Sequence, residues 1–95
     1  MKKYFIASLV KNGILGGGIV ADEEAITYHT GKLTIPDEYR HLVMKYKDID
    51  AVTQECLFIL PTVTVKMRNG ENYRFAVFFG SKRFVNTLRA MGVDG

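Results

Sequence analysis

Hydrophobic residues recur along the chain in short runs, separated about every 8–12 residues by glycine, proline and small polar residues. Within most runs apolar and polar positions alternate, which is the period of a strand that buries one face. Only one segment, near the C-terminus, has the helical period instead. The pattern therefore predicts a mainly β protein that ends in one α-helix.

The clearest predicted element is a hairpin around Asn69-Gly70, between alternating segments at residues 62–67 and 72–79. A two-residue loop would set apolar positions of one strand against polar positions of the other. A three-residue loop sets Val65 opposite Tyr73 and Val63 opposite Phe75, so that both apolar stripes share a face. We therefore predict a type I turn with Gly70 in the left-handed conformation of a G1 bulge. The inward residues of the second strand are then Tyr73, Phe75, Val77 and Phe79.

Residues 81–91 have the apolar spacing of an amphipathic helix that packs one stripe on the sheet. We expect Ser81 to cap its start and Gly92 to cap its end. Lys82 and Arg83 lie in the first turn, where the helix dipole disfavours cations slightly. Either the helix tolerates this small loss of stability, or the two residues form a cationic corner that meets an anion. The apolar stripe consists of Phe84, Val85, Leu88 and Met91.

The other segments are predicted to be strands joined by short turns. Residues 3–10 fit a strand or a helix by length. Three consecutive glycines at 16–18 would cost a helix about 1 kcal/mol each, so a strand with a bulge or a close backbone approach fits better. Asp22-Glu23-Glu24 is a polar turn. Further strands are expected at 25–30, with Ile26 and Tyr28 on one face, and at 33–35. Residues 36–40 are a loop or a single helical turn. Two more strands are expected, at 42–47 with Leu42, Met44 and Tyr46 together, and at 49–55.

The length of 95 residues and an apolar content of 47% indicate one folded domain, with residues 1–12 as a strand or helix extension of it. The apolar run after Lys2-Lys3 is short and lacks a clear cleavage site, and no stretch approaches the ~20 apolar residues of a membrane span. We expect a cytoplasmic protein. The single cysteine, Cys56, suits a reducing compartment and is expected to be a buried small hydrophobe.

Charge is unevenly distributed: residues 1–65 hold seven Lys/Arg and eight Asp/Glu, whereas residues 66–95 hold six and two. The predicted hairpin register turns Lys66 and Arg74 away from the core and places Arg68 at the tip. These three residues form a basic strip that could attract an anionic partner. Lys45, Lys47, Lys82 and Arg83 are candidates to extend this surface.

Residues for catalysis or for holding a cofactor are not recognisable in the sequence. No nucleophile stands near a base, and neither His29 nor His41 belongs to a spacing typical of a metal site. The glycines at 16–18 lack the Gly-Lys-Ser/Thr ending of a phosphate loop. We predict no catalytic, cofactor-binding or metal-binding residues and a protein that is not an enzyme.

Three stretches together resemble a pleckstrin-homology-like domain, closest to the GRAM type and its small bacterial relatives. They are residues 18–28, residues 46–52, and residues 64–70 followed by Tyr73-Arg74-Phe75 and the helix. The resemblance spans most of residues 13–92. It implies a bent, partly open antiparallel β-sandwich or barrel with the helix at one end, and binding of phosphoinositides, other anionic lipids or peptides. The first hairpin departs from the lipid-binding members, because Asp22-Glu23-Glu24 would repel a phosphate.

Three binding functions follow from these features. The first is a non-catalytic module that recognises a protein segment or a second copy of itself, for example along an exposed strand edge. The second is a peripheral membrane module whose basic strip contacts anionic lipid. The third, nucleic-acid binding, is the least favoured, because the predicted register turns Tyr73 and Phe75 inward, away from bases that could stack on them.

Overall fold

A computed structural model describes residues 2–10, 14–31, 40–57 and 59–94. They form one seven-stranded antiparallel sheet and a C-terminal helix, so the mainly β prediction is confirmed. The strands are β1 (Lys3–Val10), β2 (Ile14–Ala21), β3 (Ala25–His29), β4 (His41–Lys45), β5 (Ile49–Leu57), β6 (Leu60–Met67) and β7 (Asn72–Ala76). A 3-10 turn, η1 (Tyr46–Asp48), precedes β5, and the helix is α2 (Ser81–Ala90). The segments expected at 33–35 and at Pro36 lie outside the described residues.

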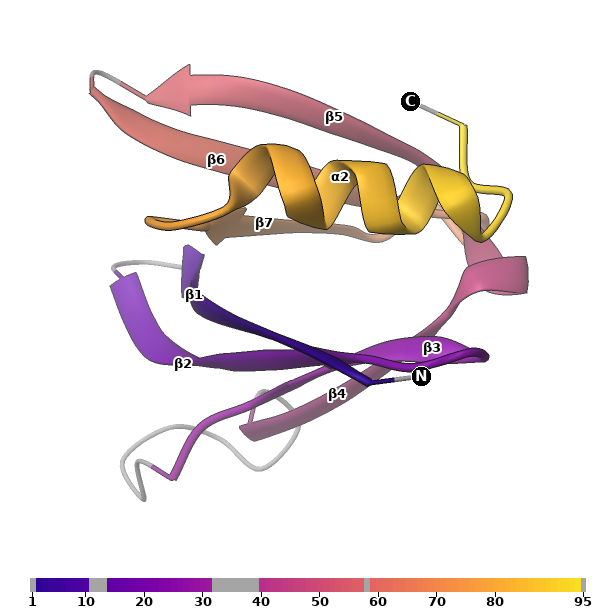
Figure 1. The fold of residues 1–95 in the computed structure, drawn as a ribbon, viewed down its shortest axis with the longest axis horizontal. Helices are drawn as coiled ribbons and strands as arrows, with labels where there is room; N and C mark the ends of the chain where they lie inside the picture. The colour runs from indigo at the N-terminus through magenta and orange to yellow at the C-terminus, as the bar shows by residue number, and fades with distance from the viewer. Residues whose placement is uncertain (1, 11–13, 32–39, 58, 95) are drawn as a thin grey trace.

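The sheet is bent into two halves and is not closed. Its strand order is β4-β3-β2-β1-β7-β6-β5, which leaves β4 and β5 as the two edges. The halves are joined where β1 pairs with β7, at Ser8 opposite Ala76 and Leu9 opposite Phe75. Figure 1 shows the β1–β4 half facing the β5–β7 half, with α2 lying across the opening between them.

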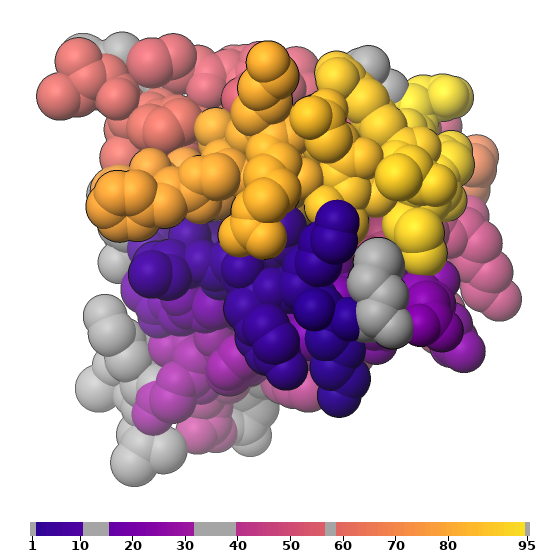
Figure 2. Space-filling model, viewed as in Figure 1, coloured from indigo at the N-terminus to yellow at the C-terminus, as the bar shows by residue number. Residues whose placement is uncertain are grey.

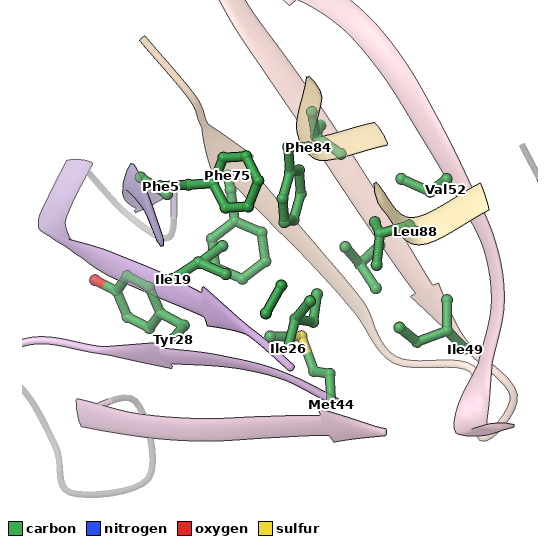
Figure 3. Close-up of a cluster of buried hydrophobic side chains, with 14 of the residues drawn as sticks. Phe5, Ile19, Ile26, Tyr28, Met44, Ile49, Val52, Phe75, Phe84 and Leu88 are labelled. Carbon is green, nitrogen blue, oxygen red and sulfur yellow. The ribbon is translucent and has the colours of Figure 1, made fainter. Parts of the chain in front are cut away.

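The core fills the space between the two halves and α2. Alternate residues of each strand point into it, as the two-residue period requires. Phe5 on β1 meets Phe84 on α2 edge to face at 5.0 Å, and Tyr28 on β3 lies 5.4 Å from Phe75 on β7, measured between ring centroids. Figure 3 shows these side chains converging from both halves and from the helix. Residues 3–10, which fitted either a strand or a helix, are therefore an interior strand of the sheet.

The hairpin prediction is confirmed in register and in turn type. Val65 lies opposite Tyr73, Val63 opposite Phe75, and Gly70 has a φ of 94°. The prediction fails at the end of the second strand, because β7 stops at Ala76 and Phe79 is 75% exposed. The chain leaves the sheet there to begin α2, so the alternation no longer decides which side chain points inward.

The C-terminal helix packs the expected stripe on the sheet. Phe84, Val85 and Leu88 are buried and Met91 is half-buried. Gly92, with a φ of 92°, ends the helix, because its N–H binds the Arg89 carbonyl while the Val93 N–H binds the Leu88 carbonyl. Within the described residues, no helix has the length and apolar character needed to cross a membrane.

The start of the helix differs from the prediction. Gly80, with a φ of 79°, occupies the capping position, and no side chain caps the helix there. The Ser81 hydroxyl instead accepts a hydrogen bond from Gln54 Nε2 at 3.2 Å. Ser81 is thus already inside the helix, where its hydroxyl contacts β5 instead of an N–H of the first turn.

The glycine segment is the strand β2, with the close approach that was expected. A Cβ at Gly17 would lie 2.4 Å from the His29 carbonyl oxygen and 2.9 Å from the Tyr28 ring. Its pairing with β1 is regular from Lys3–Ala21 to Val10–Ile14, without a bulge. Gly17 thus lets β2 lie against β3 at a place where any side chain would clash.

The prediction that Cys56 is buried is wrong. Cys56 is exposed, because the β5–β6 hairpin continues past the core as far as the Leu57–Leu60 pair. The contact between Gln54 and Ser81 shows that α2 begins beside residue 54, so the helix does not cover the last turn of that hairpin. An apolar run that extends beyond the packed layers gave the false signal of burial.

Candidate functional site

The basic strip predicted on the β6–β7 hairpin exists, but an acidic residue lies within it. Lys66 Nζ lies 3.9 Å from a carboxylate oxygen of Asp50, and Arg68 reaches the other oxygen at 3.8 Å. Arg68 also donates from Nε to the Lys47 carbonyl oxygen at 2.8 Å. Both cations are exposed, so each ion pair is weak, but Asp50 lowers the net charge that they present.

Lys45, Lys47 and Arg68 line one hollow of about 500 Å³, and Glu23 and Glu24 line it with them. The structure therefore brings four of the seven candidate cations to one region, since Lys66 shares Asp50 with Arg68. Carboxylates lie among them throughout. The result is a surface of mixed sign, which attracts an anionic partner less than the sequence alone suggests.

The acidic turn beside this hollow, Asp22-Glu23-Glu24, stabilises the fold through hydrogen bonds of Asp22. The Asp22 carboxylate accepts the N–H groups of Glu24 and Ala25 at 2.8 and 2.9 Å, and these bonds lower the pKa of Asp22. Its carbonyl oxygen accepts the Tyr46 hydroxyl at 2.7 Å. Burial, with the nearby Asp22 charge, raises the pKa of Tyr46 to about 12. The turn thus fixes the β4–η1 junction.

The other three candidate cations, Lys82, Arg83 and Arg74, do not line this hollow. Lys82 and Arg83 lie in the first turn of α2, about 12 Å along the helix from the end that borders Arg68. Arg83 is used within the molecule: its guanidinium lies 4.4 Å from the Phe5 ring centroid and donates to the Tyr4 carbonyl oxygen at 3.2 Å. Figure 2 shows α2 packed against β1 on this face. Arg74 is exposed on the outer side of β7.

The two edges of the sheet are not equally accessible. The C-terminal segment covers part of β5: Ala51 forms a bridge with Asp94, and the Val52 N–H binds the Asp94 carbonyl at 2.8 Å. That bond also shows that Val52, and by alternation Gln54, direct their backbone groups away from β6. The chain itself already occupies one part of this edge.

The β4 edge has no such cover among the described residues. The Thr30 N–H binds the Arg40 carbonyl and the Tyr46 N–H binds the Glu24 carbonyl, both at 3.0 Å. Residues with even numbers on β4 therefore bond to β3. By alternation the N–H and C=O groups of His41, Val43 and Lys45 point outward, which is the arrangement that accepts an added strand.

A hollow of about 560 Å³ lies beside this edge, between β4 and the β6–β7 turn. It combines apolar side chains with one residue of each charge. An extended segment paired with β4 would have this hollow available for its own side chains. The lining consists of Leu42, Val43, Met44, Asp48, Met67, Arg68, Asn69 and Tyr73.

Sequence reasoning identified Arg68 and Lys45 as site candidates but did not identify the β4 edge. The alternation of Leu42, Met44 and Tyr46 indicated a strand over 42–47; the strand exists but ends at Lys45, and Tyr46 is buried in the 3-10 turn η1 instead. Whether a strand is interior or at an edge depends on strand order, which the local pattern does not contain. Val43, whose side chain is 53% exposed between half-buried Leu42 and buried Met44, is an apolar residue on the outer face of this strand.

Among the described residues, no group of three or more His, Cys, Asp or Glu side chains lies close enough together to hold a metal ion within one chain.

Comparisons with known proteins establish the fold and leave the ligand open. No protein-family model matches the chain, and no curated protein matches it significantly. Among solved structures, it is similar to the C-terminal domain of an unknown protein from Leishmania infantum, with a TM-score of 0.78 and 11% sequence identity. The match covers 94% of this chain and 80% of that one. At this identity the likeness concerns the fold alone.

Proposed function

We propose that the protein is a non-catalytic binding module of pleckstrin-homology-like architecture, which takes an extended protein segment along the edge of β4. The bent seven-stranded sheet with one helix across its opening supports the architectural part of this proposal. The observation that carries the functional part is the outward direction of the backbone groups of His41, Val43 and Lys45.

An added strand would form main-chain hydrogen bonds with these three residues without breaking any hydrogen bond between β3 and β4. Such bonds are independent of the partner's sequence, so specificity has to come from pockets for alternate side chains. The hollow between β4 and the β6–β7 turn supplies one, with Leu42, Met44 and Met67 for an apolar side chain. The preferred partner is therefore an extended segment that carries at least one large apolar residue.

The proposal is tested with a display library of random peptides panned against the whole chain. Peptides that bind are then compared on the parent and on Val43→Pro. Proline removes the edge-facing N–H of Val43 and leaves the β3 ladder intact, because prolines are tolerated on the outer side of edge strands. Loss of one hydrogen bond corresponds to about a tenfold weaker binding, and the proline ring adds a steric cost.

The matched control is Gln54→Pro, which removes the corresponding N–H at the β5 edge. Both variants are first shown to fold by circular dichroism and urea unfolding. The proposal expects peptides to bind Gln54→Pro as they bind the parent. A library that yields no binding peptide, or peptides that bind Val43→Pro unchanged, would contradict it.

A further inference from the structure

The two histidines, which are separate in the sequence, lie directly opposite each other on β3 and β4. His29 pairs with His41, and both side chains are exposed. The neighbouring pair, Thr30 and Arg40, is a hydrogen-bonded pair, since the Thr30 N–H binds the Arg40 carbonyl. His29 and His41 are therefore a non-hydrogen-bonded pair, in which opposed side chains come closest, with Cβ atoms about 4.5–5.5 Å apart.

Two imidazoles at this spacing can chelate one divalent transition metal, because imidazole nitrogen is a preferred ligand of zinc, nickel and copper. Space for the rings exists on the neighbouring strand, where Gly18 lies opposite His29 and has no side chain. A Cβ at Gly18 would be 3.8 Å from His29 Cε1, so the His29 ring already extends over this position. As an exposed side chain it can rotate toward His41 within nanoseconds.

The pair lies on the face of the β1–β4 half that is turned away from β5, β6 and β7 (Figure 1). Two rows of side chains cross the four strands on this face, and neither contains an Asp, Glu, Lys or Arg. The exposed Lys45 lies in the next row, beyond Val43. Three of the large hydrophobic residues exposed by the molecule belong to them: Tyr4 at 65%, Ile6 at 62% and Val43 at 53%. The rows are Tyr4–Val20–Thr27–Val43 and Ile6–Gly18–His29–His41.

We propose that His29 and His41 bind a zinc-like divalent metal ion, and that the same pair on a second copy of this chain completes the site. Two histidines fill half of the tetrahedral shell that Zn²⁺ takes in structural sites, and two copies facing each other supply four. Sheets pack face to face about 10 Å apart. That spacing leaves room for two imidazole rings meeting one metal about 2.0–2.1 Å from each nitrogen.

The size of the face indicates why the metal is needed. Four strands about 4.8 Å apart and two rows about 7 Å apart cover on the order of 300 Å². Stable protein interfaces bury roughly 800 Å² on each partner. Apolar contact through Tyr4, Ile6 and Val43 is therefore too small to hold two copies alone, and the two rows place no charge of their own between the copies. The proposal is a metal-dependent dimer instead of a permanent one.

The test measures molar mass by light scattering while zinc chloride is added to the full chain, which carries no polyhistidine tag. A Cys56→Ser background removes the exposed thiol, which is another zinc ligand. We expect the mass to double at one Zn²⁺ per two chains and to return to the monomer value with EDTA. His29→Ala and His41→Ala should each remain monomeric at the same zinc concentration.

Two further variants separate the face from the metal ligands. Ile6→Lys keeps both histidines but places a charge in the same row of side chains, and it should remain monomeric. Phe79→Lys makes the same change at an exposed hydrophobic residue on another surface, and it should dimerise like the parent. A parent that stays monomeric at saturating zinc, even with one ion per chain, overturns the proposal. So does a zinc-dependent dimer that survives loss of either histidine or the Ile6 substitution.

Discussion

At the scale of single residues, Tyr46 joins parts of the chain that are distant in sequence. Its hydroxyl donates to the Asp22 carbonyl oxygen, and its N–H donates to that of Glu24. The side chain is 8% exposed and contributes to the core. One aromatic residue therefore fixes the β2–β3 turn, the end of β4 and the start of η1 relative to one another.

Tyr46→Phe is expected to lower the free energy of unfolding by about 1 kcal/mol, because it leaves the Asp22 carbonyl without this donor. The measurement is urea unfolding near pH 8. Tyr4→Phe is the matched control, since it removes a hydroxyl from an exposed side chain and should change the midpoint little. Equal losses of unfolding free energy in the two variants would show that the Tyr46 hydroxyl has no structural role.

The same residue predicts how stability depends on alkaline pH. The pKa of Tyr46 is raised to about 12 in the folded chain, whereas a tyrosine in the unfolded chain ionises near 10. Unfolding therefore releases a proton between these values, so the stabilisation is complete below pH 10 and is lost as pH rises toward 12. Tyr46→Phe should reduce the slope of unfolding free energy against pH in this window. An unchanged slope would contradict the assignment.

At the scale of elements, α2 shows how a correct pattern can carry a wrong detail. The stripe of Phe84, Val85 and Leu88 was predictable because apolar residues repeat with the helical period. The role of Gly92 was predictable because the position after a helix often has a left-handed conformation, which favours glycine. Ser81 was misplaced by one position, because serine also bonds to side chains and here meets Gln54.

This difference at the start of α2 is measurable. Ser81→Ala should lower the free energy of unfolding by less than about 0.5 kcal/mol, whereas loss of a true serine cap costs about 1 kcal/mol. Gly92→Ala should cost about 1 kcal/mol, because its φ of 92° is unfavourable for a residue with a Cβ. Urea midpoints of the two variants give the comparison. A larger loss for Ser81→Ala than for Gly92→Ala would restore the capping role of Ser81.

The β6–β7 hairpin was predictable because only one register lets both apolar stripes face the core. The positions of Cys56 and Phe79 were not, because each lies where its strand leaves the packed layers. Local alternation reports which residues share a face. It does not report how far the neighbouring layer extends, and that decides burial at the ends of strands.

At the scale of the whole molecule, the candidate site depends on strand order. The sequence indicated the strands that flank the site and several of its cations, including Arg68 and Lys45. It could not indicate that Asp50 forms an ion pair with Lys66, nor that β4 is an edge while β1 is interior. These facts arise from pairing between segments far apart in the chain, for which the local pattern contains no signal.

The two edges differ in a way that matters for binding. The C-terminal segment bonds to β5 at Ala51 and Val52, so an added strand there would have to displace Asp94. At β4, a partner would instead meet three residues with outward backbone groups and a hollow lined by Leu42 and Met67. This asymmetry is the reason for placing the partner at β4.

Amide hydrogen exchange along β4, with and without a peptide selected from the library, tests this placement most directly. In the chain alone, the amides of Leu42 and Met44 should exchange slowly, and those of His41, Val43 and Lys45 should exchange fast. Bound peptide should slow these three and leave Leu42 and Met44 unchanged, because only the outward groups gain partners. Peptide binding that leaves the three amides fast, or that protects Gln54 on β5 instead, would contradict recognition at the β4 edge.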